Sequence, residues 1–276
     1  MPYRLFELGK KDMPQKRGYQ LHLSRGDTAL KDVEGRKRKF EKILAVLQDF
    51  CKDPEPFNCL DIGCSAGIIT SLLGNHFQMS VGIDIDQEAV QYARRHSLSP
   101  RVHFLTADSM MLPFHNNSID VIVCNHIYEH VPQAERLMDE IYRVLKNEGC
   151  CYFAAGNKYT VIEGHYGLPF LSWVSKRVAH LYLRITGKGH FYYEEHRSLK
   201  TLKRLVKNFR IHDYTLAIIR DPERFSATDL FNAKSFLCKW TRWLAPFVYP
   251  WVPTYIWILT KNNEANRLQS LGAHPE

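Results

Sequence analysis

The sequence predicts an α/β fold built around a doubly wound, mostly parallel sheet. Short apolar runs alternate with stretches of helical periodicity up to residue 157, which is typical of a parallel sheet with helices on both faces. The first apolar run stops at a glycine-rich turn. The second ends in an acid about 20 residues downstream, as in sheets that bind nucleotide cofactors.

The glycine-rich turn lies between a predicted buried strand, 57–62, and a predicted helix, 68–77. Gly63 and Gly67 stand in this turn, where glycine accepts unusual backbone angles and lets a ligand approach the main chain closely. The first amides of the helix have no intrahelical partner and can donate to an acceptor group on that ligand. By itself the turn does not identify the ligand, because many nucleotide-binding folds use one.

Four motifs carry a family resemblance: LDIGCSAG (60–67), VGIDID (81–86), TADSMMLPFHNNSIDVIVCNHIYEHV (106–131) and EIYRVLKNEGCCYFAAGN (140–157). They resemble the class I S-adenosylmethionine-dependent methyltransferases, in the type 11-like branch that acts on small molecules. The resemblance implies a Rossmann-like sheet of seven strands with the last strand antiparallel, helical cap insertions, and S-adenosyl-L-methionine as the cofactor. The dehydrogenase fingerprint G-x-G-x-x-G is absent, which argues against a nicotinamide cofactor.

The resemblance also implies the cofactor contacts. The loop after the first strand would hold the methionine half, Asp84 the ribose hydroxyls, and Asp108 the adenine amino group. The candidate cofactor-binding residues are Asp61, Gly63, Cys64, Ser65, Gly67, Asp84, Ile85, Asp108, Ser109, Met110 and Asn125. Ser65 replaces the middle glycine of the family's G-x-G-x-G, so an inactive relative is an alternative.

Periodicity and capping residues predict the remaining elements. Helices are expected at 28–50, 86–97, 132–146, 170–185 and 198–209, and further strands at 79–84, 102–106, 119–124, 150–155, 211–219 and 254–260. The predicted organisation is an N-terminal arm (1–27), a core (28–157), a helical insertion (158–197), a C-terminal part of the core (198–262) that contains an aromatic insertion (221–253), and a tail (263–276).

Composition sets broader limits. The formal net charge is +8, which suits either an anionic partner or simple solubility. Seven cysteines without a C-x-x-C pair favour reduced thiols, and the N-terminus does not resemble a signal peptide, so a cytoplasmic location is expected. The most apolar segment, 243–259, is short and interrupted by prolines, which argues against a spanning helix. Nothing in the sequence specifies an oligomeric state.

The two insertions are rich in aromatic and basic residues. Apolar side chains at helical spacing predict that the insertions form a helical lid over an apolar small-molecule or lipid-linked acceptor. Segments 158–190 and 221–253 are also candidates for peripheral membrane contact. The alternative is a cap whose aromatic side chains pack on the core.

Histidines are the candidates for a general base, because a hydroxyl acceptor benefits from a base that titrates near neutral pH. His126 and His165 are the preferred candidates; Glu129 as base, or no base at all, is the alternative. His130 is expected to stabilise the turn into the next helix. No metal site is predicted, because the histidines lack a ligand spacing.

The sequence thus favours O- or C-methylation of a small acceptor. A nucleic-acid methyltransferase is the first alternative, weakened because residues 125–128 read NHIY and not the Asn-Pro-Pro-Tyr of amino-methyltransferases. The second is a non-catalytic adaptor that binds S-adenosylmethionine, which Ser65 motivates.

Overall fold

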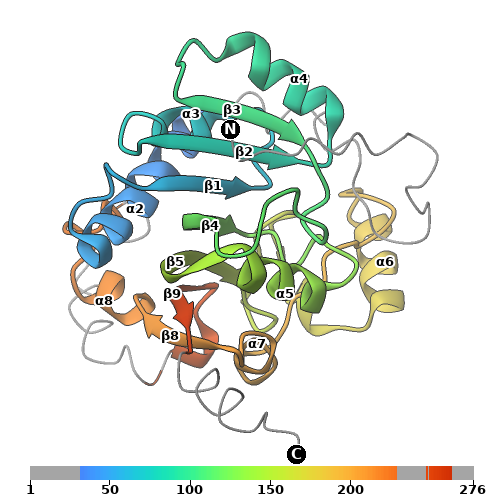
Figure 1. Cartoon of the computed structure of the whole chain (residues 1–276). Coiled ribbons are helices and arrows are strands. Elements are labelled where there is room, and N and C mark those ends of the chain that lie inside the picture. Colours follow the sequence, from blue (N-terminus) through green and yellow to red (C-terminus); the bar gives the residue numbers. More distant parts are fainter. Residues whose placement is uncertain (1–31, 229–246, 248, 263–276) are drawn as a thin grey trace, which may run out of the picture.

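A seven-stranded sheet forms the centre of the protein in a computed structural model that describes residues 32–228, 247 and 249–262. The strand order is β3-β2-β1-β4-β5-β9-β8, from β3 beside α4 at one end to β8 at the other (Figure 1). The strands are β1 (Asn58–Ile62), β2 (Met79–Asp84), β3 (Val102–Thr106), β4 (Ile119–Asn125), β5 (Leu145–Gly156), β8 (Phe209–Asp213) and β9 (Thr254–Lys261). Only β9 runs against its neighbours, which confirms the predicted mostly parallel sheet with an antiparallel last strand.

Helices cover both faces of this sheet. They are α2 (Val33–Cys51), α3 (Ile68–Leu73), α4 (Gln87–His96), α5 (Ala134–Val144), α7 (Leu199–Leu205) and α8 (Thr215–Arg220). Helix α6 (Lys176–Ile185) packs instead in a separate small cluster with Leu168, Leu171 and Tyr192. Side chains of α2, α3 and α8 share one buried cluster, and those of α5 and α7 share another. Successive residues of the central strands alternate between the two clusters: Phe153 lies in one and Tyr152 in the other. Side chains from both faces of the sheet are therefore buried, as a doubly wound fold requires.

Local sequence signals set the starts of several helices. Asp86 caps α4, because its Oδ1 accepts hydrogen bonds from the amides of Glu88 (3.0 Å) and Ala89 (3.2 Å). Ser198 caps α7 through the amide of Thr201. Both caps were expected from the sequence.

The prediction of one strand over 211–219 is wrong. Strand β8 ends at Asp213, and α8 begins at Thr215. The main-chain ladder with β9 stops here because the Ile256 amide donates to the Thr215 hydroxyl (3.0 Å), while Asp213 Oδ1 accepts from the Thr215 amide (2.8 Å). A short apolar run fits a buried helix as well as a strand, and here Ile218 is buried from a helix.

Other boundaries also differ from the predictions. The helix expected over 170–185 is divided into a 3₁₀ turn, η2 (Leu171–Trp173), and α6, separated by the extended Ser175. Before η2, a small hairpin pairs β6 (Ile162–Glu163) with β7 (Leu168–Pro169). A second 3₁₀ turn, η4 (Tyr249–Trp251), precedes β9. Predictions for the arm 1–27, the tail 263–276 and most of the insertion 221–253 lie outside the described residues.

Candidate functional site

The loop between β1 and α3 has three residues in the left-handed region of the backbone map: Gly63 (φ 75°), Ser65 (φ 49°) and Gly67 (φ 77°). A side chain on Gly63 would place its Cβ 2.1 Å from Ile127, and one on Gly67 would lie 2.5 Å from the Phe104 ring. Both glycines are therefore required by close packing as well as by backbone angle. Ser65, where the family motif has glycine, is a non-glycine residue in this same region of the backbone map.

Asp84, at the carboxyl end of β2, is tied to this loop. Its Oδ2 accepts from the Ser65 amide (2.8 Å), and its Oδ1 accepts from the Asp86 amide (2.9 Å). Burial raises the pKa of the Asp84 carboxyl, while these hydrogen bonds act in the opposite direction. Ile85 follows directly. The acid and the glycine-rich loop thus form one unit at the edge of the sheet.

The register of the strands brings the other predicted residues to the same edge. Asp84 pairs with Thr106 of β3, and Ile62 pairs with both Ile83 and Cys124, so β1 to β4 end side by side. Asp108 and Ser109 follow β3, and Asn125 is the last residue of β4. Carboxyl ends of neighbouring parallel strands are the usual binding edge of such sheets.

Two predicted cofactor residues are more buried than that role suggests. Asp61 is 4% exposed, and its Oδ2 accepts from the Thr70 hydroxyl (2.6 Å), so it anchors α3 beneath the loop. Burial raises the pKa of Asp61 to about 7. Met110 is packed in the core with Leu112 and Phe114.

His126 occupies a strained position just after β4. Its φ is 58°, and its amide donates to the Ala154 carbonyl (2.9 Å), which holds the backbone in place. Its Nδ1 lies 2.9 Å from Glu129 Oε1, and its Nε2 lies 3.5 Å from the hydroxyl of Thr254. Because a carboxylate accepts hydrogen bonds, Nδ1 donates to Glu129, and in the neutral imidazole Nε2 is then the nitrogen with the lone pair. This arrangement suits a general base.

Glu129 is 1% exposed beneath this imidazole. Burial alone would raise the pKa of Glu129, but the hydrogen bond from His126 and the nearby His130 and His196 lower it to about 2. The carboxylate is therefore ionised and fixes the tautomer of His126.

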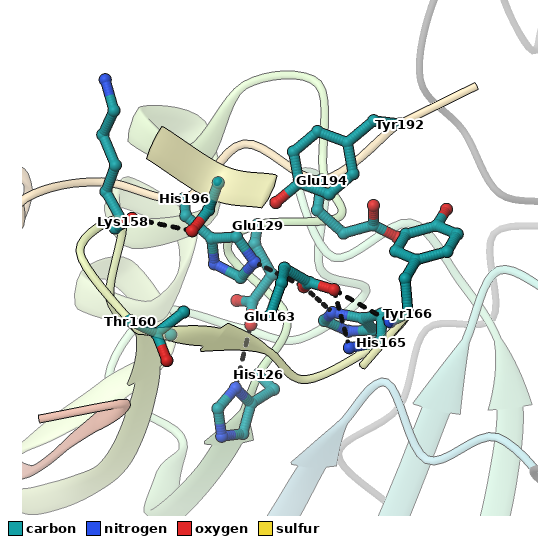
Figure 2. A network of polar contacts seen from close by, with 12 residues as sticks. His126, Glu129, Lys158, Thr160, Glu163, His165, Tyr166, Tyr192, Glu194 and His196 are labelled. Carbon is teal, nitrogen blue, oxygen red and sulfur yellow. Dashed lines mark hydrogen bonds and ion pairs between the residues drawn. The ribbon is translucent and has the colours of Figure 1, made fainter. Parts of the chain in front are cut away.

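His165 belongs to a neighbouring network built around Glu163 of β6 (Figure 2). Glu163 Oε1 accepts from His165 Nδ1 (2.7 Å) and from His196 Nε2 (3.1 Å). Burial opposes ionisation of Glu163, but these two imidazoles hold its pKa far below the usual range. Burial likewise opposes a charge on His165, yet the Glu163 carboxylate prevails and raises the pKa of His165. His130 completes the network, with its Nε2 3.2 Å from His165 Nε2.

The chain path explains why these groups meet. Asn157 forms a bridge with Arg197, so the insertion between them leaves β5 and returns to it. Tyr128 links the two ends of the insertion, because its hydroxyl donates to the Gly156 carbonyl (2.5 Å) and accepts from the Arg197 amide (2.9 Å). Gly156 lies between His196 and Glu129: a Cβ there would be 2.7 Å from the imidazole.

The structure brings His126, His130, His165 and His196 together around Glu129 and Glu163, and this group includes both preferred base candidates. The main-chain amide of His130 donates to the Ile127 carbonyl (3.0 Å) in the turn, and its imidazole contacts His165 in the network. Sequence reasoning missed Glu163 and Glu194, which are 0% and 4% exposed. Their proximity to His165 and His196 in sequence was the available signal.

The fold and this edge define a class: α/β proteins with the Rossmann-like sheet of the S-adenosylmethionine-dependent methyltransferases. Residues 60–153 match a family model described as a methyltransferase domain. Residues 60–153 thus resemble a methyltransferase domain, as the motifs predicted.

Two curated relatives and one solved structure give further similarities. The ubiquinone biosynthesis O-methyltransferase of Coxiella burnetii is 24% identical over 115 residues, 39% of this chain and 49% of that protein. The demethylmenaquinone methyltransferase of Lactobacillus johnsonii is 30% identical over 121 residues, 41% of this chain and 46% of that protein. The chain thus spans about half the length of the curated relatives it matches. A plantazolicin methyltransferase structure has a TM-score of 0.55 at 19% identity, covering 87% of this chain and 89% of its own, and shares the fold.

Proposed function

We propose that this protein transfers the methyl group of S-adenosyl-L-methionine to an oxygen or carbon atom of a small apolar or lipid-linked acceptor. The observation that carries the proposal is the meeting of the glycine-rich loop, Asp84 and Asp108 at one edge of the sheet, with His126 beside them after β4. In this proposal the loop binds the methionine half of the cofactor, Asp84 the ribose and Asp108 the adenine.

The sulfonium group of the cofactor already activates the methyl group, so the protein chiefly has to align the acceptor. Alignment of this kind supplies up to about 7–11 kcal/mol. His126 is the proposed general base for a hydroxyl acceptor, because Glu129 holds its Nδ1 while the contact of its Nε2 with the Thr254 hydroxyl is long, at 3.5 Å. His165 is the weaker candidate, since its Nδ1 and Nε2 already contact Glu163 and His130.

An apolar acceptor is supported by the surface of the insertion. Large apolar side chains of α6 and its flanking segments are exposed: Ile162, Phe170, Val178, Leu181, Ile185, Phe191 and Tyr193. The relatives' names refer to ubiquinone and demethylmenaquinone, which fits an acceptor of this kind. Within the described ranges, no helix has both the length and the hydropathy needed to cross a bilayer.

Calorimetric titration of S-adenosylmethionine and S-adenosylhomocysteine into the full chain tests the proposal. Wild-type protein should bind both. Asp84→Asn should weaken binding by roughly tenfold or more, because it loses a charge-assisted acceptor at the ribose site. The matched control is Asp53→Asn, an exposed acid outside the edge.

Failure of the folded wild-type protein to bind either compound would contradict the proposal. Unchanged affinity in Asp84→Asn would contradict the placement of the ribose. Binding of S-adenosylmethionine without turnover across hydroxyl-bearing acceptors would favour the adaptor alternative, and strong salt-dependent RNA binding would favour a nucleic-acid acceptor.

A further inference from the structure

Three buried carboxylates and three imidazoles gather beside the proposed methyl-transfer site. Glu129, Glu163 and Glu194 are at most 4% exposed, and His130, His165 and His196 lie among them. The ion pairs of Glu163 are with His165 and His196. Burying several carboxylates is costly unless cations compensate them, so this group of side chains is suited to a bound cation.

We propose that His130, His165 and Glu194 form a binding site for a divalent transition-metal ion of the zinc class. One ligand atom from each residue lies within 4.8 Å of the others. The Nε2 atoms of His130 and His165 are 3.2 Å apart. Two nitrogens bound tetrahedrally to one Zn²⁺ at the usual bond length would be roughly 3.3 Å apart. The imidazoles therefore already have the separation that the ion requires.

Glu194 supplies the third ligand. It is 4% exposed, and its Oε2 has no hydrogen-bond partner among the described residues. A buried carboxylate oxygen without a partner is unfavourable, and coordination of a cation would satisfy it. Two histidines and one glutamate are a common ligand set of zinc sites that keep a fourth position open for water.

Glu163 takes the supporting position that such sites need. A metal-bound histidine usually donates its other ring N–H to a carboxylate, which fixes the ring and makes the bound nitrogen more basic. His165 does this: its Nδ1 lies 2.7 Å from Glu163 Oε1 (Figure 2). Its Nε2 lies 3.2 Å from His130 Nε2. His196 shares the same carboxylate oxygen and so holds Glu163 from the opposite side.

The ion would connect three separate segments. His130 follows β4, His165 lies in the β6–β7 hairpin, and Glu194 lies between α6 and α7. Binding should therefore stabilise the fold of the insertion, since an ion that binds only the folded state raises its stability. This readout does not depend on catalysis or on the acceptor, so the metal site can fail while the proposed function holds.

Titration of Zn²⁺ into chelator-treated full-length protein tests the site by calorimetry and thermal unfolding. The expected result is one ion per chain with a raised Tm. His130→Ala and Glu194→Gln should each weaken binding at least tenfold, and Glu163→Gln by roughly 10–100-fold. His103→Ala, an exposed histidine of β3, is the control and should bind as the wild type does.

Circular dichroism and a cooperative melt would first establish that each variant folds. Anomalous diffraction at the zinc edge should then place the ion between His130 and His165. The proposal is overturned if the wild type shows no saturable binding, if His130→Ala and Glu194→Gln bind as tightly as the control, or if the anomalous peak lies elsewhere.

Discussion

At the scale of single residues, His126 combines backbone strain with a buried partner. Its φ is 58°, although it is not a glycine. The backbone is held there by the hydrogen bond from the His126 amide to the Ala154 carbonyl of β5, and the imidazole is held by Glu129. Strain of this kind persists only where the surroundings fix it, and it is concentrated at functional positions. The pair resembles other carboxylate–imidazole arrangements in which the acid sets the tautomer and the imidazole accepts the proton.

His126→Asn should lower kcat for a hydroxyl acceptor by roughly 10²-fold or more, the usual contribution of a general base. Asparagine tolerates the left-handed backbone, so the loop should remain folded. Glu129→Gln should lower kcat less, because the imidazole stays but its tautomer is no longer fixed. Methyl transfer from labelled S-adenosylmethionine measures kcat for both variants. The affinity of each variant for the cofactor is the control and should be unchanged. Full activity in His126→Asn would exclude this residue as the base.

Asp61 should make stability depend on pH. Its pKa is raised from 3.8 to about 7 in the folded protein, so the unfolded chain loses this proton first. Where the unfolded state binds fewer protons, stability falls as the pH rises, here between about pH 4 and pH 7, by about 1.4 kcal/mol for each unit of pKa shift.

Asp61→Asn keeps an acceptor for Thr70 and removes the titration. Urea unfolding at pH 5 and pH 8 should therefore show the wild type losing stability, relative to this variant, on going to pH 8. If the difference in unfolding free energy between the wild type and Asp61→Asn were the same at pH 5 and pH 8, the role assigned to Asp61 would be wrong.

At the scale of elements, the sequence predicted those parts of the site whose signals are local. The first strand, the glycine-rich turn and α3 are encoded within 20 residues, and Asp86 caps the next helix as its position indicated. The apolar run after Asp213 was ambiguous, because the ladder ends and α8 begins at two side-chain hydrogen bonds: the Ile256 amide of β9 donates to the Thr215 hydroxyl, and the Thr215 amide donates to Asp213.

The histidine network lies beyond what spacing can reveal. His130 and His165 are 35 residues apart, and His196 is 33 residues from Glu163. They meet because Asn157 and Arg197 return the chain to the end of β5, and because Gly156 leaves room for His196. A search for metal ligands at short sequence intervals therefore finds at most pairs such as Glu163 and His165, and not the set of His130, His165 and Glu194.

At the scale of the whole molecule, charge and exposed apolar area lie on the same part of the surface. In α6, Leu181 (57% exposed) and Ile185 (75%) accompany the exposed Arg177 and Arg184, and the chain as a whole carries a net charge of +8. Its interior face is anchored, with Ala179 and Leu183 fully buried in a small cluster around Leu171. A helix with one anchored face and one apolar, basic outer face is suited to a lipid interface.

We therefore expect the full chain to co-sediment with vesicles containing phosphatidylserine and to bind neutral vesicles less, since basic residues add attraction to an anionic surface. The double variant Leu181→Asp, Ile185→Asp should lose most of this binding, because it removes two apolar contacts and adds two negative charges. Leu98→Asp is the matched control: Leu98 is 95% exposed and follows α4, which packs on the end strand β3. If both variants bound vesicles as the wild type does, α6 would not be the contact surface, and the apolar face would be assigned to the acceptor alone.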